Sequence, residues 1–275
     1  MIEILSARPA DLPDIPRGVT HLAFRSAVDG REDWALLWPP ARGRTYLVCI
    51  HGYGSHADQL YTRADLRRDW WPEFQARGVG VLTPNIRDNS WMSPPAAADL
   101  RALLDYLRTE HRAERFVLFG GSMGGTSVLV YAVLHPEDMV GVGSLCPATD
   151  IAARHEWCKR YSCEALPAGI SAAIAEAYGG TPAEIPEVYD RHSCLAHADR
   201  LTMPVYLAHG DADEIIPISE SRALAALLPA RTLKYREIRG GGHDSPLALD
   251  VIREGLDWIL PPEYGNRSRL DGGCT

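Results

Sequence analysis

Phe116-Val-Leu-Phe-Gly120-Gly121-Ser122-Met123-Gly124-Gly125 contains a Gly-x-Ser-x-Gly motif where an apolar, strand-like run ends and a helical pattern begins. A serine on such a tight turn has strained backbone torsions, so small residues must flank it. Its hydroxyl projects above the sheet, and the amide of Met123 points into the same space. A glycine-rich turn with a helix-capping serine is the alternative. Because strand, turn and helix signals coincide, we interpret Ser122 as a nucleophile on a nucleophile elbow.

Strand-like and helical stretches alternate on both sides of this motif. Alternating βα units imply a mostly parallel sheet with helices on both faces. We therefore predict an α/β fold with a central sheet of about eight strands. The expected parallel strands are Thr45–Ile50, Val79–Thr83, Phe116–Phe119, Met139–Cys146, Val205–His209 and Leu233–Ile238, and the expected helices are Leu60–Arg77, Ala96–His111, Ser122–His135, Ser219–Leu228 and Pro246–Leu260.

Two regions depart from this alternation. The runs Val19–Val28 and Asp33–Trp38 flank the turn signal Asp29-Gly30, and we expect them to form an antiparallel hairpin at the edge of the sheet. Between Pro147 and Met203 the alternation stops. A structureless loop of that length is improbable in a compact domain. We therefore expect one domain over residues 1–275, with a small helical lid inserted at residues 147–203.

A glycine-rich segment after the last expected strand offers a base for the serine. It reads Ile238-Arg239-Gly240-Gly241-Gly242-His243-Asp244. A serine hydroxyl is a weak nucleophile until a base takes its proton. Three glycines allow a loop to carry the imidazole toward the strand ends, although an exposed histidine on a surface loop is the alternative. We interpret His243 as the general base.

A carboxylate just past a strand can accept the Nδ1–H of such a base and fix its tautomer. The segment Val205-Tyr-Leu-Ala-His209-Gly210-Asp211-Ala212-Asp213-Glu214 offers two candidates. Asp213 is preferred, because the spacing His-Gly-x-x-Asp leaves Asp211 to form the turn. Both could instead cap the helix that begins near Pro217. Asp150, just after the preceding strand, is the reserve candidate.

A second glycine-containing loop, Ile50-His51-Gly52-Tyr53-Gly54, also follows a strand directly. Glycines there let backbone N–H groups face a developing oxyanion. We assign the oxyanion-hole donors as the amides of Tyr53 and Met123. The Tyr53 ring is also a candidate for the acyl pocket, with packing against the lid as the alternative. A phosphate-binding loop does not fit, because the GxxxxGK[ST] pattern is absent and GYGSHA does not match GxGxxG.

The motifs HGYG, GGSMGG, HGDAD and GGGHD, in this order, resemble those of α/β-hydrolases over roughly residues 19–260. The stretch from Tyr178 to Pro204 is similar to the prolyl-oligopeptidase-like branch, which includes acyl-peptide-cleaving peptidases and small single-domain esterases. The resemblance implies a single α/β-hydrolase domain. It also implies a catalytic triad of Ser122, Asp213 and His243.

The chain departs from that branch at two places. Ser193-Cys194 stands where the branch often has Ser-Pro, and Arg87-Asp88-Asn89-Ser90-Trp91 replaces its usual Arg-Gly element. Neither difference touches the triad, so both bear on the substrate rather than on the chemistry.

The composition and net charge of the chain bear on its possible partners. The 275 residues carry a formal net charge of −8 and no Lys/Arg block, which does not favour nucleic acid. No run of about 18 apolar residues and no signal-peptide pattern occur, so we expect no membrane partner and a cytoplasmic location. The sequence has neither the CxxC pairs nor the clustered histidines that are typical of a zinc site, so we expect no metal. The proposed chemistry also requires no cofactor. A homodimer stays open, as does a Cys163–Cys194 bridge, although free thiols are favoured in the cytoplasm.

We therefore expect a serine esterase that cleaves a carboxylic ester of a small or medium-sized substrate through an acyl-enzyme. A serine peptidase of aminopeptidase or acyl-peptide-cleaving type, an acyl or thioester transferase, and a non-catalytic binding protein are the alternatives. The aromatic candidates for the substrate pocket, besides Tyr53, are Trp91, Trp157 and Tyr161, with core packing as their alternative role. The basic lid candidates, which either meet a carboxylate or are solvated, are Arg154, His155 and Arg160.

Overall fold

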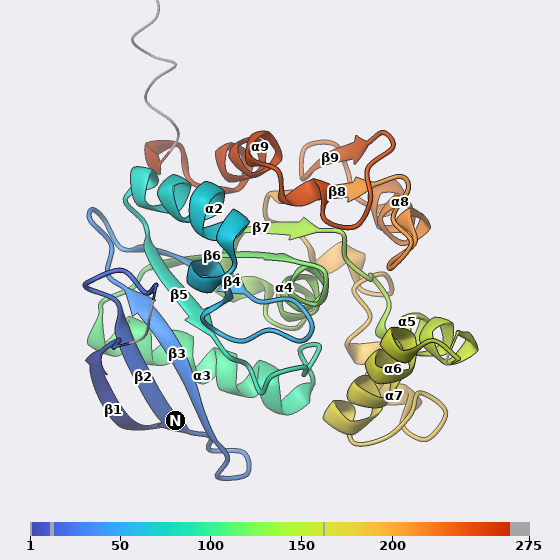
Figure 1. Ribbon diagram of the computed structural model, residues 1–275, viewed down its shortest axis with the longest axis horizontal. Coiled ribbons are helices and arrows are strands. Elements are labelled where there is room, and N and C mark those ends of the chain that lie inside the picture. The colour runs from blue at the N-terminus through green and yellow to red at the C-terminus, as the bar shows by residue number, and fades with distance from the viewer. Residues whose placement is uncertain (1, 12–13, 162, 265–275) are drawn as a thin grey trace, which may run out of the picture.

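The computed structural model describes residues 2–11, 14–161 and 163–264. Within these residues nine strands form one sheet in the order β1-β2-β3-β5-β4-β6-β7-β8-β9 (Figure 1). The strands from β5 to β9 run parallel, and the β1-β2-β3 end joins β5 in antiparallel pairing. The strands are β1 (Glu3–Pro9), β2 (Thr20–Arg25), β3 (Glu32–Trp38), β4 (Thr45–Ile50), β5 (Gly80–Pro84), β6 (Arg115–Gly121), β7 (Met139–Leu145), β8 (Val205–Gly210) and β9 (Leu233–Ile238).

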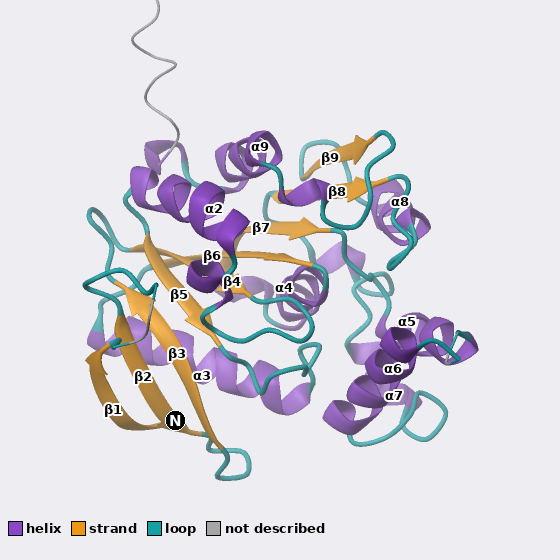
Figure 2. Ribbon diagram, viewed as in Figure 1, coloured by secondary structure: helices purple, strands orange, loops and turns teal. Residues whose placement is uncertain are grey.

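Helices cover both faces of the sheet (Figure 2). On one face, α1, α2 and α9 bury Trp70, Phe74 and Leu256 against the strands. On the other, α3, α4 and α8 bury a second apolar layer that includes Leu103 and Val130. The helices are α1 (Gln59–Thr62), α2 (Ala64–Arg77), α3 (Pro94–Glu110), α4 (Met123–Leu134), α5 (Ile151–Arg160), α6 (Ala165–Tyr178), α7 (Pro186–Arg191), α8 (Ile218–Leu227) and α9 (Leu249–Ile259).

Burial explains why the central strands read as continuous apolar runs. Every residue of Thr45–Ile50 and of Val205–Gly210 is buried, because helices lie on both sides of these strands. Strand β2 is instead buried only at alternate positions in its second half, as expected nearer a sheet edge. The predicted α/β fold is confirmed.

The first strand was not predicted, and it brings the sheet of the described residues to nine strands, against an expectation of about eight. β1 pairs antiparallel with β2, so the hairpin formed by β2 and β3 lies inside the edge and does not form it. No side chain of Glu3–Pro9 is fully buried, so the segment carries no clear apolar alternation. Backbone pairing, supported by the Arg25–Glu3 ion pair at 2.9 Å, holds this strand in place.

The segment between β7 and β8 is helical, as expected. Its helices α5, α6 and α7 lie together beyond the carboxyl ends of the central strands (Figure 1). Among the described residues, no helix is both long and apolar enough to cross a bilayer.

Candidate active site

The Gly-x-Ser-x-Gly motif forms a sharp turn between β6 and α4. Ser122 has φ 57° and ψ −123°, a left-handed conformation that a non-glycine residue adopts only under constraint. Its amide donates to the Leu145 carbonyl at 2.8 Å, which holds the turn against β7. A Cβ on Gly120 would lie 2.6 Å from the Gly124 carbonyl carbon, and one on Gly124 would meet the Ile50 carbonyl oxygen. The motif therefore needs glycine at both positions because the backbones approach so closely.

The structure brings together the three side chains that the sequence singled out. His243 Nε2 lies 2.9 Å from Ser122 Oγ, and His243 Nδ1 lies 2.7 Å from Asp213 Oδ2. Asp213 follows β8 and His243 follows β9, so the ends of three strands supply the set. This continuous series of hydrogen bonds has the geometry in which a histidine can take a proton from serine.

Asp213 is held more tightly than the sequence suggested. Its Oδ1 accepts from the amides of Ile215 and Ile216 at 2.8 and 2.9 Å, while its Oδ2 faces His243 and, at 3.1 Å, His209. Burial alone would raise the pKa of Asp213. The hydrogen bonds from His209 and His243 outweigh it and hold the pKa well below its ordinary range. The carboxylate is therefore ionised at neutral pH.

His209 was not predicted as part of the site. Its Nε2 faces two acceptors, Asp213 and the Ile216 carbonyl at 2.9 Å, so Nε2 carries the proton. Its Nδ1 then accepts from the Ser221 hydroxyl at 2.7 Å. In the sequence, His209 is distinguished only by its place before Gly210, at the end of the expected strand Val205–His209.

The two competing carboxylates lie elsewhere. Asp211 is exposed and accepts from the Gly240 amide at 2.6 Å, which joins the two loops after β8 and β9. Asp150 caps α5 through the Ala153 amide at 2.9 Å and accepts from the Ser193 hydroxyl. Neither contacts His243.

The loop after β4 lies beside the nucleophile. Among the described residues, the amides of Tyr53 and Met123 have no hydrogen-bond acceptor. The neighbouring amides are both occupied: Gly52 donates to Gln59 Oε1 at 2.9 Å, and Gly54 donates to Asn89 Oδ1 at 2.7 Å. The free Tyr53 amide thus lies between two anchored amides, and together with the Met123 amide it suits the binding of a negatively charged oxygen.

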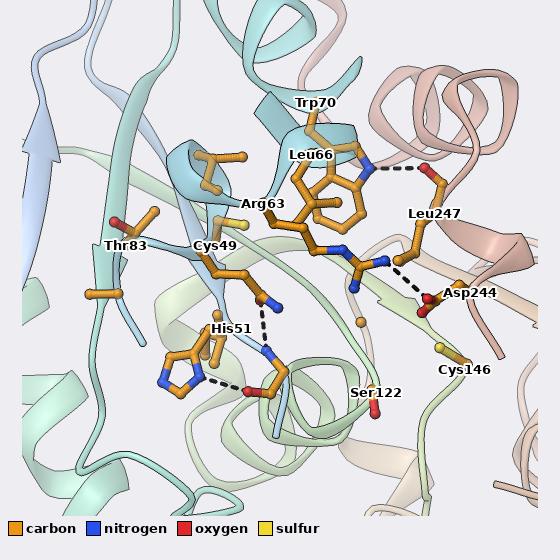
Figure 3. Close-up of a pocket in the computed structure, with 16 residues that line it drawn as sticks. Cys49, His51, Arg63, Leu66, Trp70, Thr83, Ser122, Cys146, Asp244 and Leu247 are labelled. Carbon is orange, nitrogen blue, oxygen red and sulfur yellow. Dashed lines mark hydrogen bonds and ion pairs between the residues drawn. The ribbon is translucent and has the colours of Figure 1, made fainter. Parts of the chain in front are cut away.

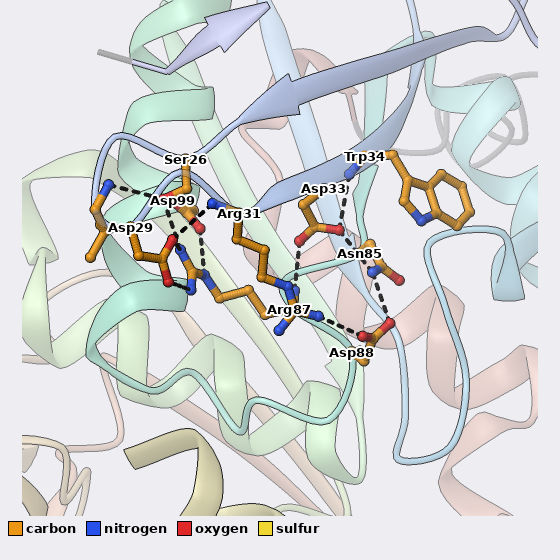
Figure 4. Close-up of polar contacts among 10 residues, drawn as sticks. Ser26, Asp29, Arg31, Asp33, Trp34, Asn85, Arg87, Asp88 and Asp99 are labelled. Carbon is orange, nitrogen blue, oxygen red and sulfur yellow. Dashed lines mark hydrogen bonds and ion pairs between the residues drawn. The ribbon is translucent and has the colours of Figure 1, made fainter. Parts of the chain in front are cut away.

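Asn89 belongs to a constrained loop between β5 and α3. Ile86, Arg87 and Asp88 all have positive φ, between 51° and 60°. The Arg87 guanidinium holds this loop through Asp99 at 2.6 Å and Asp29 at 2.7 Å (Figure 4). This is the segment in which the chain departs from the prolyl-oligopeptidase-like pattern, and its contacts could not be read from the sequence.

A small, partly open pocket of about 50 Å³ lies beside Ser122 (Figure 3). Arg63, in the break between α1 and α2, pairs with Asp244 at 3.0 Å across it and so ties the histidine loop to α2. Apolar residues such as Leu66 and Leu247 form another part of the wall. The thiol of Cys49 also lines the pocket, and burial raises its pKa to about 12, so it is uncharged at neutral pH.

The aromatic candidates fall into two groups. Trp157 and Tyr161, on and just after α5, pack with ring centroids 4.6 Å apart and planes tilted by 42°, and they line an open cleft of about 650 Å³. Trp91 is 1% exposed and packs 6.3 Å from the Tyr53 ring. The Tyr53 hydroxyl lies against α6, since a Cβ on Gly169 would come within 2.9 Å of it.

The structure also describes the cysteines and the groups of potential metal ligands. Cys163 and Cys194 are free thiols in the structure, whereas Cys274 lies outside the described residues. Potential metal ligands gather twice in the part of the chain that the structure describes. One group consists of Cys146, Asp213 and His243. In this group, His243 and Asp213 are already hydrogen-bonded to each other. The other group comprises His135, Glu137 and Asp138, whose first and last members hydrogen-bond arginines.

The fold, with a serine, a histidine and an aspartate in contact at the carboxyl ends of its strands, defines an α/β-hydrolase of the serine-hydrolase type. The model of the BD-FAE family matches residues 37–228, and the chain belongs to this family. The resemblance to α/β-hydrolases inferred from the sequence is thus confirmed.

A curated relative matches part of the chain. A "Serine hydrolase-like protein" of Danio rerio is 28% identical over 118 residues, which are 42% of this chain and 34% of that protein. This chain therefore matches only about a third of that curated relative's length.

Three examples illustrate the solved structures that share the fold. The first is a puromycin-hydrolyzing peptidase of Mycobacterium tuberculosis, with TM-score 0.63 and 19% identity over 94% of this chain and 45% of that one. Est1E from Butyrivibrio proteoclasticus has TM-score 0.61 and 22% identity over 84% and 96%. An S-formylglutathione hydrolase from Agrobacterium tumefaciens has TM-score 0.64 and 15% identity over 94% and 100%. At these identities the likeness shows that the fold is shared.

Proposed function

We propose that the protein hydrolyses a carboxylic ester of a small or medium-sized substrate, with Ser122 as nucleophile, His243 as general base and Asp213 as the acid of the triad. The observation that carries this proposal is the unbroken contact of Ser122 Oγ with His243 Nε2 at 2.9 Å and of His243 Nδ1 with Asp213 at 2.7 Å. A serine, an imidazole and a buried carboxylate in this order suit acyl transfer.

The reaction then has two halves. Ser122 attacks the ester carbonyl while His243 takes its proton, and Asp213 stabilises the imidazolium that forms. The amides of Tyr53 and Met123 hold the oxyanion, and one such donor typically lowers the barrier by about 3 kcal/mol. His243 next protonates the alcohol that leaves. Water repeats the sequence on the acyl-enzyme and releases the acid.

The segment 147–203 serves in this proposal as a cap on a single domain. Its helices α5 and α6 form one wall of the 650 Å³ cleft, and the loop after β8 forms the opposite wall. The cleft between these walls leaves room for an ester substrate.

Ester and amide substrates with the same chromophore separate the esterase proposal from the peptidase alternative. We expect p-nitrophenyl acetate and butyrate to be hydrolysed, and an aminoacyl p-nitroanilide not to be, when initial rates are measured at 405 nm. The Ser122→Ala variant serves as the control for spontaneous and contaminating hydrolysis. Anilide turnover with a kcat/KM comparable to that of the esters would favour a peptidase.

Asn89 provides a separate test of the oxyanion loop. Asn89→Ala removes the acceptor that holds the Gly54 amide at 2.7 Å, next to the proposed Tyr53 donor. We expect kcat to fall roughly fivefold with little change in KM, because one neutral hydrogen bond contributes about 1 kcal/mol. Asn89→Asp keeps an acceptor and should retain most of the activity. Equal losses in both variants would indicate that the contact does not position the loop.

A further inference from the structure

Arg154, on α5, differs from the other deeply buried arginines in having no carboxylate partner. Arg77 pairs with Glu73 at 2.6 Å and with Asp257 at 2.9 Å, and the buried side chain of Arg87 pairs with Asp99 at 2.6 Å. Arg154 is 1% exposed, yet it forms no ion pair within the described residues. A buried charge that forms no ion pair is costly, so Arg154 is a candidate for binding an anionic group of a ligand.

The contacts of Arg154 leave its guanidinium only partly satisfied. One terminal nitrogen donates to the Ile215 carbonyl at 2.7 Å, and the guanidinium lies 4.9 Å from the centre of the Trp157 ring. Its Nε is buried and has no acceptor among the described residues. Burial lowers the pKa of Arg154, which reflects the loss of water without full replacement by protein groups.

The carboxylates of Glu220 and Asp213 lie near enough to favour the charged form of Arg154, but neither forms an ion pair with it. Asp213 already accepts four hydrogen bonds from its own loop and from two histidines. Glu164 and Glu214 are exposed to solvent. Glu220 accepts from the Thr149 amide at 2.8 Å, and burial raises its pKa.

Arg154 also stands at the right place to meet a substrate. Its side chain lines the 650 Å³ cleft together with Trp157, Asp213, Ile215 and Pro217. Asp213 is one hydrogen bond from His243, so this cleft adjoins the proposed reaction centre. Ser122 does not itself line this cleft, so a ligand held by Arg154 has to extend past the Asp213 loop to bring its ester to the nucleophile.

We propose that Arg154 binds a carboxylate on the substrate, so that the enzyme prefers esters that carry a free carboxylate over neutral esters of the same size. This inference rests on the proposed esterase function. The carboxylate belongs either to the acyl part, as in a monoester of a dicarboxylic acid, or to the alcohol part. An arginine that is preorganised by Trp157 and by a carbonyl suits this role, because charged hydrogen bonds to carboxylates are strong and directional.

The test compares charged and neutral esters in matched pairs. On the acyl side, mono-p-nitrophenyl glutarate is paired with p-nitrophenyl pentanoate. On the alcohol side, 4-carboxyphenyl acetate is paired with 4-carbamoylphenyl acetate. We expect the wild type to prefer the charged member of one pair. In Arg154→Met, the ratio of charged to neutral kcat/KM should fall by about 10- to 100-fold, mainly through KM, as the loss of a charged hydrogen bond implies.

Two further variants separate binding from structure. Arg154→Lys keeps the charge and should recover part of the preference, whereas Arg160→Met removes an exposed arginine from the same helix and should change nothing. A purely structural Arg154 would lower both rates together and leave the ratio unchanged. Melting temperatures show whether each variant is folded.

Labelling of Ser122 by a fluorophosphonate distinguishes the two possible failures. If the wild type is labelled and hydrolyses neutral esters without any preference for charge, the role of Arg154 is overturned and the esterase proposal stands. The same holds if Arg154→Met retains the preference. If the wild type is neither labelled nor active on any of the four esters, the proposed function itself fails and the inference falls with it.

Discussion

Ser122→Ala should lower kcat for a p-nitrophenyl ester by roughly 10⁶-fold, to the level set by binding and the oxyanion amides alone. The substitution removes the only atom that forms the acyl bond and leaves the turn intact, because alanine has no more bulk than serine at φ 57°. Steady-state rates on enzyme purified free of host esterases measure the effect. The melting temperature should stay close to that of the wild type.

A serine on the same helix provides the matched control. Ser127 is buried on α4, one turn beyond the motif, and has no place in the proposed mechanism. Ser127→Ala should therefore keep its activity within a few-fold. If Ser122→Ala retained more than about a hundredth of the wild-type kcat, Ser122 would not be the nucleophile.

Asp213→Asn should reduce kcat by about 10⁴-fold, the second largest effect that we expect. Because the pKa of Asp213 is held well below its ordinary range, its carboxylate is charged at the assay pH and accepts the Nδ1–H of His243. An amide can present its NH₂ group to Nδ1 instead, which favours the wrong tautomer and removes the charge that stabilises the imidazolium.

Asp211→Asn is the control for Asp213→Asn, since the two residues share one loop. Asp211 is exposed, and within the described residues its side chain accepts only from the Gly240 amide, so its amide variant should remain close to the wild type in kcat. Melting curves of both variants separate a catalytic loss from unfolding. Equal activities of the two variants would remove Asp213 from the mechanism.

The sequence was informative where function depends on local backbone geometry. The crowding of Gly120 and Gly124 against neighbouring backbone requires a recognisable pattern around Ser122, and strand ends place the aspartate and histidine loops in order. The spacing after His209 also favoured Asp213 over Asp211, and the structure places Asp213 against His243. These features are short-range, so they leave a signature in consecutive residues.

Features that depend on distant contacts could not be predicted. Asn89 reaches the Gly54 amide from a loop 35 residues away in sequence. Arg154 was only one of several basic residues in a helical segment, and its isolation became apparent only with the packing of α5 against the loop after β8. Strand β1 was missed because its side chains remain at least partly exposed and its pairing comes from the backbone.

The most direct test is to locate the site of covalent labelling by a fluorophosphonate, with intact-mass and peptide mass spectrometry on the wild type and Ser122→Ala. The proposed mechanism predicts one adduct per chain on the wild type, on the peptide that contains Ser122, and none on the variant. An unlabelled wild type, or an adduct that persists in the variant on another residue, would contradict Ser122 as the activated nucleophile.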